Sequence, residues 1–222
     1  DEMCAIRDHF AGLGRAPTRL FLAGEDPTIE VWMLMRVSLN LLRQPWDPYV
    51  GNLGYPEPHS LLFSDPLTSL AALVAPLRLF TDNGALLYNV ALFLALVLTA
   101  YGFYRLALRL TSLPAAAIVA GLVVAFMPQQ MHRLYLGALA YVALAGFAFL
   151  ILGLLSLLER PRLSAALGTA AAFVFQASIG GYWALFSTLI ALLVAAWGWR
   201  ALRSWRTLAF AALAAALATL AL

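Results

Sequence analysis

The sequence has no lysine, a single cysteine and little charge of either sign. Only 11% of its residues are charged and 63% are hydrophobic, whereas soluble domains are about 45 to 50% apolar and about 25% charged. The composition therefore excludes an ordinary soluble domain and predicts an integral membrane protein. The one cysteine, Cys4, cannot close an intrachain disulfide bond.

Carboxylates are almost missing after residue 83, where Glu159 is the only one among eleven acidic residues. A site that needs carboxylates must therefore draw on the N-terminal part, and above all on the polar stretch Gly24–Pro66. The fourteen arginines mostly stand at the ends of apolar runs, where arginine anchors helices at a membrane surface. Nucleic acid is therefore not an expected partner.

A helix over about 26–42 is predicted at the start of this stretch. Asp26 followed by proline is a strong start signal, because an Asp side chain accepts the unpaired N–H groups of a first helical turn. Arg36, Asn40 and Arg43 recur at i, i+4 and i+7 and form one polar stripe. The pattern predicts a helix that lies on a membrane surface.

The segment Gln44–Pro66 carries five prolines, which favour an ordered loop over a regular helix. A second helix is expected over 67–80, with Asp65 as its N-cap. It is too short to cross a membrane, since about 20 helical residues are needed to span the hydrocarbon.

The remainder predicts an all-α, polytopic transmembrane bundle over 84–222, preceded by an external first loop over 1–83. Gln176 falls inside an apolar run, where an amide usually bonds to a neighbouring helix, and Gly180-Gly181 is expected to form a turn. The expected spans cover about 85–106, 110–128, 136–158, 163–179, 182–199 and 207–222.

Several segments resemble the GT-C superfamily of polyprenyl-phosphate-dependent glycosyltransferases, which includes protein O-mannosyltransferases and aminoarabinose transferases. The segments are GEDPTIEVW, YPEPHSLLFSDPLTSLAALVAPL, YNVALFLALVLTAYGFYRLALRLT and FMPQQMHRLYLGAL. They look most like a bacterial, multi-span branch of that superfamily, and the likeness covers about residues 20–200. The resemblance implies a protein of the bacterial inner (plasma) membrane, with further spans before Asp1 and after Leu222.

The resemblance also implies a mechanism and its residues. An external carboxylate, Asp26 or its neighbour Glu25, activates an acceptor hydroxyl that displaces polyprenyl phosphate from a lipid-linked sugar. Many members use a divalent metal (Mg or Mn) with an acid in the next external loop. Here that loop, expected at 127–135, has no carboxylate, and His132 with Arg133 would neutralise the phosphate instead.

Other interpretations of these residues remain open. Asp26 also suits a purely structural N-cap, Arg133 also suits an arginine that extends to the membrane interface, and Glu57 and His59 sit in a proline-rigid segment that can present both to a cleft. A transporter or lipid flippase is one alternative function, although transporters tend to carry ionisable residues at mid-membrane. A non-catalytic GT-C-like membrane protein is another.

The arginine pattern predicts the topology. Under the positive-inside rule, Arg109, Arg160 and Arg203 face the cytoplasm, while Gly137 and Gly181 face the same external side as the first 83 residues. Labelling of single cysteines from outside intact cells, in a background without the native cysteine, measures this. Labelling of position 160 from outside would contradict the topology.

Overall fold

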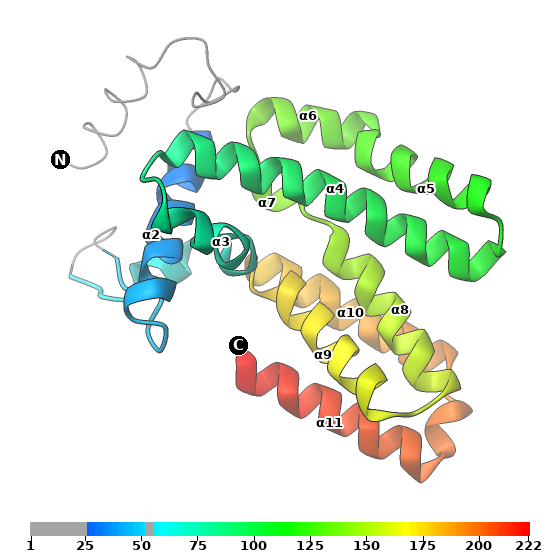
Figure 1. Cartoon of the computed structure of the whole chain (residues 1–222). Helices are drawn as coiled ribbons and strands as arrows, with labels where there is room; N and C mark the ends of the chain where they lie inside the picture. The colour runs from blue at the N-terminus through cyan, green and yellow to red at the C-terminus, as the bar shows by residue number, and fades with distance from the viewer. Residues whose placement is uncertain (1–25, 52–55) are drawn as a thin grey trace. The chain divides into compact units, whose positions relative to one another are not determined.

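A computed structural model describes residues 26–51 and 56–222, and all regular structure in these ranges is helical. This confirms the all-α class (Figure 1). The elements are α2 (Asp26–Arg43), η1 (Ser60–Phe63), α3 (Thr68–Val74), η2 (Ala75–Leu79), α4 (Gly84–Thr111), α5 (Pro114–Phe126), α6 (Pro128–Leu136), α7 (Leu139–Val142), α8 (Ala145–Glu159), α9 (Leu163–Ala177), α10 (Gly181–Trp197), η3 (Ala201–Arg203) and α11 (Trp205–Ala221).

Three helical stretches are long and apolar enough to cross a membrane: Gly84–Thr111, Pro114–Leu136 and Leu139–Glu159. Helices α9, α10 and α11 have 15, 17 and 17 residues. At 1.5 Å per residue they are about 22 to 26 Å long, shorter than the ~30 Å of hydrocarbon in a bilayer. That any of these six stretches crosses a membrane stays a prediction.

The expected helix over 67–80 is present as α3 followed by η2, and it is too short to span, as predicted. Its expected N-cap is wrong. Leu67 occupies the cap position with a φ of 54°, and no side chain caps the helix. The left-handed residue, rather than an Asp side chain, turns the chain into α3, so Asp65 has no capping role.

The chain divides into two compact units. The amino-terminal unit comprises Asp1–Val97 and Phe126–Val142, and the carboxy-terminal unit comprises Leu98–Ala125 and Ala143–Leu222. Segments far apart in the sequence are thus brought into the same unit, and α4 contributes residues to both.

In the amino-terminal unit, α2 buries Val31, Met33, Leu34 and Val37 and packs against α3 and η2 (Figure 1). Each such side chain contributes about 1.5 to 3 kcal/mol when it leaves water. The predicted polar stripe is partly wrong, because Asn40 is buried. Its Nδ2 donates hydrogen bonds to the carbonyls of Pro48 at 2.9 Å and Val50 at 2.8 Å, so it holds the following loop.

One carboxylate ties three parts of this unit together. Glu30 of α2 accepts a hydrogen bond from the backbone N–H of Leu139 at 2.6 Å and lies 3.5 Å from that of Ala140. The buried Tyr88 of α4 has its hydroxyl 3.5 Å from the same carboxylate and donates to the carbonyl of Gly137. Glu30 therefore fixes α2 to the chain that leads into α7.

In the carboxy-terminal unit, small residues let α8 and α9 approach closely. A Cβ atom added at Gly153 would lie 2.9 Å from the Cα atom of Thr169, so only glycine fits there. Gln176 is fully buried and its Nε2 donates to the carbonyl of Ala143 at 3.0 Å, which confirms its packing role. The turn at Gly180 is also confirmed, since α9 ends at Ala177 and α10 begins at Gly181.

Replacing Glu30 with alanine is expected to lower the free energy of unfolding by about 1 to 3 kcal/mol, because the N–H of Leu139 loses its acceptor in a partly buried position. Chemical denaturation of the full chain in detergent measures the change. The same replacement at the exposed Glu57 is the control. A Glu30→Ala protein as stable as the Glu57→Ala protein would show that the hydrogen bonds of Glu30 do not stabilise the fold.

Candidate functional site

The expected catalytic acids stand at the start of α2. Glu25 and the side chain of Asp26 lie outside the part of the chain that the structure describes. Asp26 itself is the first residue of α2, one helical turn before Glu30. Residues at i and i+4 share a helix face, and four residues advance the helix by about 6 Å. The backbone of Asp26 is therefore one turn away from the Glu30 tie.

The first loop carries a histidine–carboxylate pair. His59 Nε2 lies 3.2 Å from Asp47 Oδ1, and both side chains are roughly half exposed. The Asn40 hydrogen bonds to Pro48 and Val50 fix the segment that holds Asp47. A carboxylate bonded to one ring nitrogen orients the imidazole and leaves the other nitrogen for a ligand. Asp47 is a functional candidate that sequence reasoning missed.

The segment that carries His132 and Arg133 is a helix, so its prediction as a loop is wrong, whereas its external location stays a prediction. Met127 is extended and Pro128 occupies the first turn of α6, a position for which proline is preformed. The helix ends at Gly137, whose φ of 72° is the left-handed conformation that favours glycine. Pro128 thus begins a new helix at the position where the sequence predicted the end of one.

Arg133 has an unusual environment. Its guanidinium carbon lies 4.6 Å from the centre of the Tyr141 ring. Its Nε is buried and has no hydrogen-bond partner among the described residues. Tyr141 follows directly after Ala140, beside the Glu30 carboxylate. A series of contacts therefore connects the start of α2 with Arg133. His132, in contrast, is exposed.

Two further arginines of the same unit, which the sequence did not indicate as candidate site residues, have a similar environment. Arg36 of α2 and Arg78 of η2 each have a buried Nε without a hydrogen-bond partner in the described ranges. The Arg78 side chain is only 7% exposed, and its Nη1 lies 3.2 Å from the exposed Asp82 without hydrogen-bond alignment. An arginine within the apolar run VAPLRLF was the sequence signal for Arg78.

The expected site residues that the structure describes contact other residues and not one another. Described residues of the first loop and of α6 belong to one compact unit. His59 meets Asp47, and Arg133 meets Tyr141. Between the described side chains of Glu57 or His59 and those of His132 or Arg133, the structure has no hydrogen bond or ion pair. Their convergence on one cleft stays a prediction.

The described residues do not supply a full ligand set for a divalent metal. Within 26–51 and 56–222, no three His, Cys, Asp or Glu side chains gather into a group that could hold a metal ion. The Asp47–His59 pair supplies two donors.

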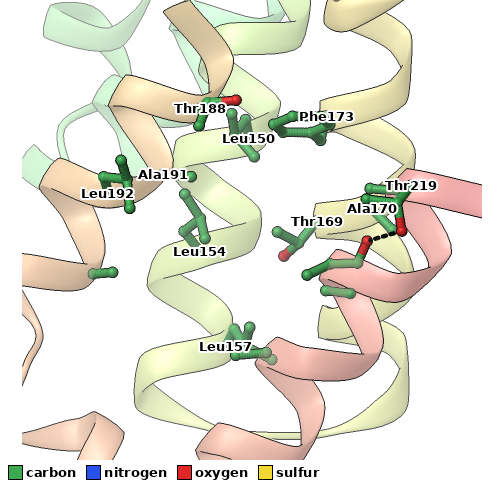
Figure 2. Close-up of a pocket in the computed structure, with 15 residues that line it drawn as sticks. Leu150, Leu154, Leu157, Thr169, Ala170, Phe173, Thr188, Ala191, Leu192 and Thr219 are labelled. Atoms are coloured by element: carbon green, nitrogen blue, oxygen red, sulfur yellow. Dashed lines mark hydrogen bonds between the residues drawn. The ribbon is translucent and has the colours of Figure 1, made fainter. Parts of the chain in front are cut away.

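An apolar cavity of about 340 Å³ lies among α8, α9, α10 and α11 in the carboxy-terminal unit. Figure 2 shows leucine, alanine, threonine and phenylalanine side chains turned toward it. The hydroxyls of Thr169, Thr188 and Thr219 each donate to a carbonyl one turn earlier in their own helix. The cavity thus suits hydrocarbon and has no acid, base or cation for catalysis.

Comparison with known proteins gives no family model, no curated protein and no solved structure that matches the chain. The chemistry of the described residues therefore carries the functional argument.

Asp65 gives a pH prediction. Burial raises the pKa of its carboxyl above the ordinary value of 3.8. The folded state then binds this proton more tightly than the unfolded chain, so the contribution to stability is largest at low pH and is lost as the pH rises through the raised pKa.

Asp65→Asn is therefore expected to raise the unfolding temperature at pH 7. It is also expected to narrow the difference between the unfolding temperatures at pH 4 and pH 7. Thermal unfolding of the full chain at both values tests this. Glu57→Gln removes a charge at an exposed position and serves as the control. A lower unfolding temperature for Asp65→Asn at pH 7 would contradict the assignment.

Proposed function

We propose that the protein is a glycosyltransferase of a bacterial plasma membrane, with a GT-C-like fold, that moves a sugar from a polyprenyl-phosphate donor to an acceptor hydroxyl at the external face. The observation that carries the proposal is the set of three arginines, Arg36, Arg78 and Arg133, whose buried Nε atoms have no described partner in one compact unit.

A buried Nε–H group without a partner is costly, because such a donor loses its bond to water and gains none in return. A phosphate group would supply both negative charge and several acceptor oxygens, and guanidinium binds phosphate with paired hydrogen bonds. A lipid-phosphate donor keeps its chain in the bilayer and its phosphate at the helix ends. This chemistry supports a lipid phosphate as the ligand.

The contacts of Glu30 support a shared site for acid and cation. They connect the first turns of α2, where Asp26 stands, with α7, whose Tyr141 contacts Arg133. In the reaction, Asp26 accepts the proton of the acceptor hydroxyl, with Glu25 as its neighbour. The hydroxyl oxygen bonds to the anomeric carbon, and the bond from that carbon to the phosphate oxygen breaks. The polyprenyl phosphate leaves with the bonding electrons, and arginines such as Arg133 stabilise its charge. His59, Glu57 and His132 are the proposed contacts to sugar or acceptor.

The test uses the full-length protein in membranes, supplied with undecaprenyl phosphate that carries a radiolabelled hexose or pentose. Asp26→Asn is expected to reduce transfer at least a hundredfold, because Asn cannot take up the proton. Folding is expected to persist, since Asn has nearly the same size and shape as Asp.

Arg133→Lys is expected to raise the KM for the donor about tenfold, because an ammonium group cannot form the paired contacts. Arg43→Lys, at the exposed end of α2, is the matched control. Unchanged transfer by the Asp26→Asn protein would defeat the mechanism, and an unchanged KM for Arg133→Lys would remove Arg133 from the donor site.

A further inference from the structure

A second pocket in the carboxy-terminal unit is lined by arginines and by apolar side chains. Its volume is about 560 Å³, and it lies among α4, α8 and α9. Arg105, Arg162, Ser156 and Ser164 belong to its polar lining, and Phe149 and Phe175 belong to its apolar lining. A ligand with an anionic group and a hydrocarbon portion matches this arrangement.

Neither Arg105 nor Arg162 forms an ion pair with a carboxylate of their unit. The carboxy-terminal unit has seven arginines and one acidic residue, Glu159. The Glu159 carboxylate is already bonded to Arg109 at 2.7 Å. Arg105 donates to the hydroxyl of Tyr101 at 2.8 Å, which leaves its charge uncompensated.

The start of α9 adds donors at the same end of the pocket. Arg162 is the N-cap residue, and no side chain caps the helix. The N–H groups of Ala165 and Ala166 bond to the Arg162 carbonyl, so those of Leu163 and Ser164 are the ones without an acceptor within the helix. Such helix ends favour anions. Ser164, in the first turn, lines the pocket.

Gly168 gives an independent indication that the pocket is kept open. A glycine within a helix costs about 1 kcal/mol relative to alanine. At Gly153 on the facing helix, close packing against Thr169 explains the glycine, but a Cβ atom added at Gly168 would meet nothing within 4 Å. Packing therefore does not require Gly168, which lines the pocket and leaves its space free.

We propose that this pocket binds an anionic phospholipid of the leaflet at the arginine-rich helix ends. Arg105 and Arg162 contact the lipid phosphate, and an acyl chain lies along Gly168 toward Phe175. Basic pockets between helices are typical sites for such headgroups. This site is distinct from the proposed transfer site, and the inference does not depend on that function.

The experiment measures binding of fluorescent phosphatidylglycerol to the purified full chain in detergent, with phosphatidylcholine carrying the same fluorophore as the reference lipid. We expect at least tenfold tighter binding of phosphatidylglycerol. The double variant Arg105→Gln/Arg162→Gln is expected to lose this preference, whereas Arg203→Gln, which removes an arginine that stacks on Trp199 outside the pocket, keeps it within twofold.

Gly168→Leu fills the pocket with a better helix former and is expected to weaken phosphatidylglycerol binding about tenfold without loss of helix content. Gly181→Leu is its matched control, since a Cβ atom there also meets nothing within 4 Å and the residue does not line the pocket. Equal binding of both lipids, or unchanged binding in Gly168→Leu, would overturn the proposal. Displacement by glycerol phosphate at the same concentration as phosphatidylglycerol would identify a soluble phosphate as the ligand and overturn it too.

Discussion

The bond from the Leu139 N–H to the Glu30 carboxylate is the interaction on which the amino-terminal unit depends. It joins positions 109 residues apart. The chain leaves helical geometry at Gly137, and the backbone groups exposed by such a break must find partners when water is excluded. Glu30 supplies one acceptor, and Tyr88 donates to the Gly137 carbonyl. By bonding to the backbone groups at this break, the two side chains link α2 and α4 to α7. They thereby connect the helix that begins at Asp26 to Tyr141, whose ring contacts Arg133.

The same requirement for partners makes the arginines informative. Glu30 supplies an acceptor for the Leu139 N–H, but the buried Nε atoms of Arg36, Arg78 and Arg133 have no described acceptor. Acceptors are also scarce in the carboxy-terminal unit, where Glu159 is the only carboxylate. Arginine keeps its charge under all ordinary conditions, so the imbalance must be met by solvent or by an anionic ligand. Phosphate is the chemistry common to both proposals, a sugar donor in one unit and a structural lipid in the other.

Local signals in the sequence predicted most helices and failed where distant contacts decide the conformation. Pro128 is compatible both with the end of a helix and with the first turn of a new one, and the residues that follow show a helix. Asn40 has the spacing of a solvated stripe, yet two carbonyls of the next loop bury it. The structural role of Glu30 had a detectable signal in the sequence. It precedes Met33, Leu34 and Val37 by three, four and seven residues, which places an acid on the apolar face of α2.

The sequence by itself determined the all-α class, the positions of the apolar helices and the presence of ten of the eleven acidic residues in the first 83 positions, because composition and helical periodicity are local properties. Only the tertiary structure decided that α6 belongs to the same compact unit as the first loop, that His59 pairs with Asp47, and that a basic pocket opens beside Gly168. Each of these depends on contacts between residues distant in the chain. Apolar helices of similar composition can pack in many ways, and the few polar groups that must find partners select among them.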